Sequence, residues 1–109
     1  MPGKFLAEFE LYVMLAVARL GDDAYGASIR DEIENRVNRP VSIGALYATL
    51  HRLGGKDLVR FEEEAESGRA GRARKYVQLT VEGRDALDHS TAMLQRMMDG
   101  VATEIGGSR

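Results

Sequence analysis

The sequence predicts a mainly α-helical protein with one small β-hairpin and a long C-terminal helix. Within residues 5–55, apolar side chains recur every three or four positions in three successive segments, as amphipathic helices require. Two short segments that alternate apolar and polar residues follow within residues 58–79. From Leu87 onward, apolar residues return every seven positions. We therefore expect the order helix, helix, helix, hairpin, long helix.

The composition is typical of a single folded domain. The chain has 109 residues, of which 44% are hydrophobic and 29% are charged. Because it contains no cysteine, disulfides, thiolate metal sites and cysteine nucleophiles are excluded. The longest apolar run, Leu11 to Ala18, is far shorter than the roughly 20 residues that cross a bilayer, and acidic residues near the start disfavour a secretion signal. We expect a cytoplasmic protein with no membrane partner and no cofactor.

The first helix is predicted over Phe5–Leu20 and ends at Gly21. Its main apolar stripe consists of Leu6, Phe9, Val13, Ala16, Val17 and Leu20. Phe5, Tyr12 and Leu15 lie outside this stripe, so the helix has apolar residues on two sides. One side would pack on the core of its own domain, and the other side on a second subunit.

The second helix is predicted over Tyr25–Val37, with Ile29 and Ile33 facing inward. It ends before Pro40, because the residue preceding a proline is disfavoured in the α region. Val41 should then be extended, where it would supply a third strand to the sheet. Ser42 is a good N-cap for the third helix, which ends at Gly54–Gly55.

The third helix has an unusual outer face. Its apolar side carries Ile43, Leu46, Leu50 and Leu53. The opposite side carries Gly44, Ala45, Ala48, His51 and Arg52, where a helix facing only water would more often carry Glu, Lys or Gln. Small residues let a helix approach base edges in the major groove, and a helix N-terminus favours phosphate. Two structural alternatives stay open: Gly44 and Ala45 permit close helix packing, and Tyr47 is a half-buried core residue.

Positive charge gathers around the third helix and the hairpin, although the net charge is only −2. The strands are predicted at Leu58–Glu66 and Arg74–Leu79, with a glycine- and arginine-rich tip between them. The cations in and near these elements are Arg36, Arg39, Arg52, Lys56, Arg60, Arg69, Arg72, Arg74 and Lys75. Such a patch would bind DNA by releasing counterions from phosphates, although a charge run can also be simply solvated.

Three helices followed by a hairpin describe a winged helix-turn-helix, and several motifs resemble the PadR family of bacterial transcriptional regulators. The matching residues are Tyr25-Gly26, Pro40-Val41-Ser42, Gly44, Leu46-Tyr47, Leu50, Arg52-Leu53, Leu58-Val59, Arg72 to Tyr76, Leu79-Thr80 and Gly83. The resemblance runs from about Phe5 to Leu87. It implies a dimer that represses transcription by binding a palindromic operator. It assigns DNA contacts to Ser42, Gly44, Tyr47, Arg69, Arg72 and Arg74, and a DNA-facing position to Tyr25 and Gly26.

The chain departs from this family in two places. Gly54 to Leu58 stands where the family usually has a Glu-x-x-Gly-Leu turn. The chain also has a single long C-terminal helix, as in short-tailed members. We expect residues 1–80 to form the winged helix-turn-helix, with the first helix contributing to the dimer. Residues 81–109 would form the dimerisation helix, which continues to about Glu104, and a frayed tail.

The C-terminal helix carries more apolar residues than one small domain can cover, so it predicts a homodimer. The predicted dimer-interface residues are Phe5, Phe9, Tyr12, Leu87, Leu94, Met97, Met98 and Val101. Met93 and Met97 are candidates for a pocket that binds a small apolar or aromatic effector, with core packing as the alternative. His89 and Met93 lie one turn apart, but two such residues make no metal site.

The leading hypothesis is a DNA-binding transcriptional repressor that binds double-stranded DNA. The predicted DNA-binding residues are Tyr25, Gly26, Ser42, Gly44, Ala45, Tyr47, Ala48, Arg52, Lys56, Arg69, Arg72 and Arg74. The alternative is a winged-helix adaptor that uses the same face to bind an acidic protein. An enzyme is not expected, because neither His51 nor His89 has a nucleophile with a supporting base.

Overall fold

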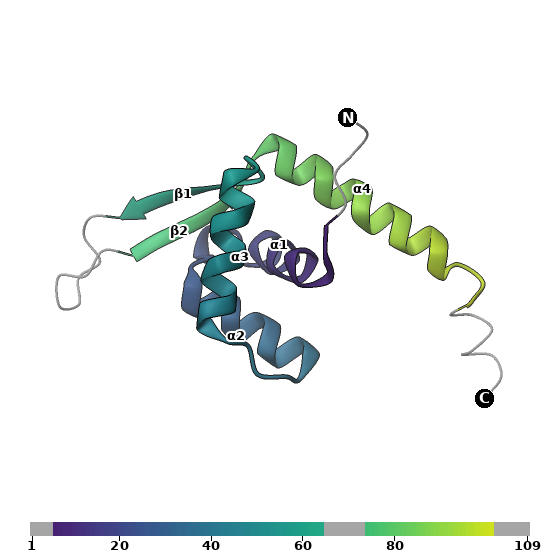
Figure 1. Ribbon diagram of the computed structural model, residues 1–109, viewed down its shortest axis with the longest axis horizontal. Coiled ribbons are helices and arrows are strands. Elements are labelled where there is room, and N and C mark those ends of the chain that lie inside the picture. Colours follow the sequence, from purple (N-terminus) through teal and green to yellow (C-terminus); the bar gives the residue numbers. More distant parts are fainter. Residues whose placement is uncertain (1–5, 65–73, 102–109) are drawn as a thin grey trace.

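The computed structural model describes residues 6–64 and 74–101, and shows a three-helix unit followed by a hairpin and a fourth helix (Figure 1). The elements are α1 (Glu8–Leu20), the short 3-10 helix η1 (Gly21–Asp23), α2 (Gly26–Val37), α3 (Ile43–Gly55), β1 (Val59–Glu64), β2 (Arg74–Leu79) and α4 (Val81–Met98). The hairpin and α4 extend in opposite directions from the three helices (Figure 1). The predicted order of elements and the winged-helix architecture are confirmed.

The helix ends follow local capping chemistry. Ser42 caps α3, because its Oγ accepts a hydrogen bond from the Ala45 N–H at 3.2 Å. Thr80 caps α4 in the same way, with its Oγ1 accepting from the Gly83 N–H at 2.8 Å. The start of α1 differs from the prediction: Ala7 is the N-cap, and its N–H donates to the side chain of Glu10 at 3.0 Å. The helix therefore begins at Glu8, and Phe5 lies outside the described residues.

The core is formed where α1, α2, α3 and the base of the hairpin meet. Its fully buried side chains include Met14, Ile29, Leu46, Leu53 and Leu58. The predicted inward faces of α2 and α3 are confirmed, with one exception. Ile43 is exposed, because it stands in the first turn of α3, at the edge of the helix packing.

The predicted third strand at Val41 is wrong within the described part of the chain, where the sheet has two strands. The Val41 N–H donates to the Glu34 carboxylate at 2.7 Å instead of to a strand. The hairpin gains its extra backbone pairing from the start of α2. The Val77 N–H donates to the Ala24 carbonyl at 2.8 Å, and Tyr25 forms an isolated antiparallel bridge with Tyr76. The hairpin is thereby fixed to the helix-turn-helix.

The fourth helix is only half covered by the rest of the chain. Ala86 and Leu87 are buried, whereas Leu94, Met97 and Met98 are exposed. α4 ends at Met98 rather than near Glu104, and Gly100 then adopts a positive φ of 86°. Residues 102–109 lie outside the described part. No helix in the described ranges is long and apolar enough to span a bilayer.

Candidate nucleic-acid interface

The outer face of α3 is open. Gly44, Ala45, Ala48 and His51 are all exposed. Among the described residues, a Cβ built on Gly44 would meet only the Ser42 Oγ, at 3.7 Å, so no other described element covers that position. Close helix packing therefore does not explain why Gly44 is small. This face has room for a large partner to approach the α3 backbone.

Tyr47 connects α3 to the start of α2. Tyr47 is 54% exposed, so it is not a core residue. Gly26 is buried directly beneath its ring, since a Cβ on Gly26 would overlap the Tyr47 hydroxyl and lie 2.8 Å from its Cζ. Tyr47 thus covers Gly26, and the DNA-facing role of Gly26 stays a prediction. Gly26 provides the space that positions the tyrosine ring.

A groove of about 560 Å³ lies between α3, the start of α2 and the hairpin. The α3 side contributes Tyr47, Leu50 and His51, and the hairpin contributes Phe61 and Lys75 among others. Arg74 lies over the ring of Tyr25, with its Cζ 4.2 Å from the ring centroid. Tyr25 in turn makes an edge-on contact with Tyr76 at 5.7 Å. This stack holds the first cation of β2 beside the groove.

The hairpin also carries acidic residues. Lys75 stands opposite Glu63 in the strand register, and Arg74 stands opposite Glu64. Opposite charges at such positions attract one another. This end of the two strands, far from Leu58, is therefore less positive than its content of Arg74 and Lys75 suggests. Arg69 and Arg72, the other two predicted hairpin contacts, lie outside the described residues.

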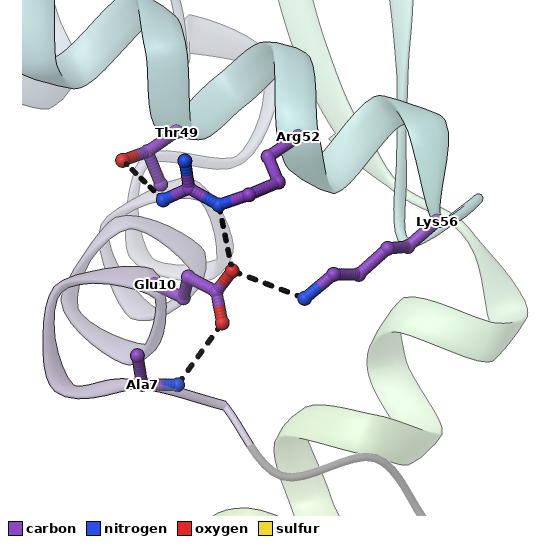
Figure 2. Close-up of polar contacts among 5 residues, drawn as sticks. All are labelled: Ala7, Glu10, Thr49, Arg52 and Lys56. Carbon is purple, nitrogen blue, oxygen red and sulfur yellow. Dashed lines mark hydrogen bonds and ion pairs between the residues drawn. The ribbon is translucent and has the colours of Figure 1, made fainter.

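Arg52 and Lys56 point to Glu10 rather than outward (Figure 2). The Arg52 Nε lies 3.3 Å and the Lys56 Nζ 3.1 Å from the same oxygen, Oε2 of Glu10. Arg52 also donates to the Thr49 Oγ1 at 3.2 Å. Both predicted DNA-contact cations thus have a protein counterion in this structure, and their assignment to the DNA-binding surface stays a prediction. Sequence reasoning missed Glu10, whose only signal was an acid between Phe9 and Leu11 in an apolar run.

Comparison with known proteins decides the family. The model of the transcriptional regulator PadR-like family matches residues 14–89. The chain belongs to the PadR-like family. Its members are transcriptional regulators, so this protein is a regulator and not an enzyme. No curated protein sequence matches the chain significantly.

Solved structures agree with this assignment. A PadR-like transcription factor from Bacteroides fragilis is 28% identical with a TM-score of 0.70, and the match covers 86% of each chain. A PadR family regulator from Eggerthella lenta is 26% identical with a TM-score of 0.66, covering 89% of this chain and 87% of the other. The F93 protein from STIV, a winged-helix DNA-binding protein, shares the fold at 18% identity, with a TM-score of 0.71 and coverage of 89% and 98%.

The predicted dimer residues that the structure describes fall into three groups. Leu94, Met97, Met98 and Val101 are exposed apolar side chains at the end of α4 and just after it. Phe9 and Tyr12 are partly buried against the core of their own chain. Leu87 is buried in that core, and its place in the dimer interface stays a prediction.

The predicted effector pocket is not enclosed within the residues that the structure describes. Met93 is half-buried, and Met97 is 77% exposed. His89 is exposed, and no group of three metal-ligating side chains occurs in the described ranges.

The ion pairs of Glu10 make stability depend on pH. Burial raises the pKa of Glu10, but hydrogen bonds from Ala7, Lys56 and Arg52 outweigh it and leave the pKa below its ordinary value. A lowered carboxylate pKa contributes stability that is complete above the unfolded-state pKa of about 4.3 and is lost as the pH falls through the folded-state pKa. Protonation in acid should therefore weaken the attachment of α3 to α1.

We expect the stability difference between wild type and Glu10→Gln to shrink in acid. Urea unfolding at a series of pH values should show a constant difference near neutrality that falls below about pH 4, where the wild-type carboxylate becomes neutral as well. A difference that stays the same from about pH 7 to about pH 3 would show that the charge of Glu10 does not stabilise the fold.

Proposed function

We propose that this PadR-like regulator binds a palindromic DNA operator as a homodimer in the cytoplasm and represses transcription. The observation that carries the proposal is the exposed outer face of α3, which bears no long side chain at Gly44, Ala45 or Ala48. A helix with such a face fits into a major groove about 12 Å wide, with its backbone close to the base edges. The winged-helix fold and the family support a role on DNA.

In this arrangement, the N-terminal half of α3 contacts the duplex. Ser42 and the first N–H groups of α3 would bind a phosphate, as helix N-termini commonly do. The Tyr47 hydroxyl, placed over Gly26, would donate to a second phosphate. Arg74, held against the Tyr25 ring, would contact the flanking backbone together with Arg69 and Arg72. The bases would be read by the small-residue face itself and by His51 beside it.

The dimer would form through the end of α4. The exposed apolar residues there, Leu94, Met97, Met98 and Val101, would pack on their counterparts and on α1 of the second copy. A two-fold axis would set two α3 helices about 34 Å apart, matching an inverted repeat in the operator. A small apolar effector that relieves repression would bind where the partner closes the space around Met93 and Met97.

Replacing both Leu94 and Met97 with glutamate should convert the dimer to a monomer. Charged carboxylates would have to be buried without partners in the apolar interface, which costs several kcal/mol. Sedimentation equilibrium measures the mass directly. The control is Val81→Glu, at an exposed residue at the other end of α4. This variant should remain a dimer. A wild type that sediments as a monomer at tens of micromolar would contradict the proposal.

The hairpin arginines should contribute affinity without sequence preference. Arg72→Ala and Arg74→Ala should each weaken binding to every duplex and flatten the dependence of log K on log salt by up to about 0.9 per lost phosphate contact. Fluorescence anisotropy with a random duplex over a range of salt measures both effects. Unchanged affinity and an unchanged salt slope in both variants would show that these hairpin arginines do not contact DNA. A wild type that binds no duplex at low salt would instead favour the protein-binding adaptor.

A further inference from the structure

Glu10 is a buried carboxylate shared between two helices (Figure 2). Its side chain is only 5% exposed. Its Oε1 accepts from the Ala7 N–H at 3.0 Å and so completes the start of α1. Its Oε2 receives the cations of Arg52 and Lys56 from the second half of α3 and its C-cap. A carboxylate is costly to bury unless its oxygens are paired, and here both are.

These bonds fix α3 in a way that its apolar contacts do not. Leu46, Leu50 and Leu53 attach α3 to the core, but hydrophobic burial is non-directional. Hydrogen bonds between charged groups have preferred directions. Arg52 is further oriented by Thr49, one turn earlier and itself buried. The Glu10 bonds therefore define the rotation and the axial position of α3 relative to α1.

Glu10 also determines which group neutralises the charges of two cations on α3 and its C-cap. Arg52 lies one turn after Ala48 on α3, so its side chain borders the face that we assign to DNA, and it is 53% exposed. Without Glu10, this guanidinium would be available to a phosphate. Phosphate contacts add affinity for any sequence and carry no base information.

We propose that Glu10 is a positioning residue that determines DNA specificity. It fixes α3 against α1, and it holds Arg52 and Lys56 away from phosphates. The affinity for DNA therefore depends more on the bases that α3 contacts. This inference rests on the proposed DNA binding. It assigns an effect on that binding to Glu10, a residue that does not touch the duplex. Loss of Glu10 should therefore harm discrimination more than total affinity.

The test compares Glu10→Gln with wild type in the full chain on two duplexes, one obtained by binding-site selection with the wild-type protein and one random. The ratio of the two affinities should fall at least about tenfold. Binding to the random duplex should tighten, and its salt slope should steepen by up to about 0.9 for each cation that turns to a phosphate. A merely structural role would lower both affinities together and leave the slope unchanged.

Glu8→Gln is the matched control. It removes the same charge from the same helix, but Glu8 accepts a hydrogen bond from Tyr12 rather than from α3. Its affinity ratio and salt slope should equal those of wild type. If Glu10→Gln has the same affinity ratio and salt slope as Glu8→Gln, while wild type prefers the selected duplex, the inference is overturned and the proposed function stands. If wild type binds neither duplex, both are overturned.

A double-mutant cycle separates the contact to α3 from the cap on α1. In an Arg52→Gln, Lys56→Gln background, adding Glu10→Gln should not change the affinity ratio further, because the α3 bonds are already gone. The hydrogen bond from Ala7 to Glu10 Oε1 can persist with glutamine, whose amide oxygen also accepts. A full additional loss of discrimination in that background would show that the effect does not depend on Arg52 and Lys56, and would contradict the proposal.

Discussion

Gly83→Ala should lower the free energy of unfolding by about 3 kcal/mol. A Cβ at this position would overlap the Leu58 carbonyl oxygen and lie 2.9 Å from its carbonyl carbon. That oxygen is already fixed, because it accepts a hydrogen bond from the Thr80 N–H at 3.1 Å. The obstacle is backbone rather than a flexible side chain, so relief requires α4 to move away from the residue that precedes β1. Urea unfolding followed by circular dichroism measures the loss.

The control for this substitution is Gly55→Ala, at the last residue of α3. No atom of the described residues lies within 4 Å of a Cβ there. Alanine should therefore be neutral or stabilise the helix by up to about 1 kcal/mol. Equal stability of the Gly83 and Gly55 variants would mean that α4 does not pack against Leu58 as described.

Ala48→Glu should abolish DNA binding while leaving the fold intact. Ala48 is exposed on α3, so a glutamate side chain has room in the free protein and the melting temperature should change little. In the complex it would place a carboxylate against phosphates and base edges, and a like-charge contact costs several kcal/mol. We expect an affinity loss of about 100-fold or more, measured by fluorescence anisotropy on the selected duplex.

Ala48→Gln separates charge from size in this experiment. Glutamine has nearly the same shape as glutamate but no charge, so it should weaken binding by less, and by an amount that salt changes little. Operator binding by the glutamate variant at wild-type affinity would place this face of α3 outside the groove.

The sequence predicts the elements well because their signals are local. Ser42 before a periodic apolar run, Pro40 after α2 and the alternation around Val77 each depend on a few neighbouring residues. The exposed small-residue face of α3 was predicted for the same reason. It follows once Leu46, Leu50 and Leu53 are assigned to the core.

The contacts that the sequence does not reveal all join distant residues. Arg52 and Lys56 look like DNA contacts until the fold brings Glu10, 42 and 46 positions earlier, to their side. Gly26 looks like a surface glycine until Tyr47 covers it. The pairing of Tyr25 with Tyr76, in place of a strand at Val41, likewise depends on where the hairpin meets α2. Such contacts depend on tertiary geometry, which periodicity does not encode.

The central claim is that the small-residue face of α3 lies against a DNA duplex, and the absence of native cysteine permits a direct measurement. A single Ala48→Cys variant can be mixed with selected duplexes that carry a thiol-tethered base at successive positions. We expect a disulfide cross-link at one or two positions in each half-site, and none from Ala92→Cys on α4. Cross-linking from Ala92 but not from Ala48, on a duplex that both variants bind, would contradict the account.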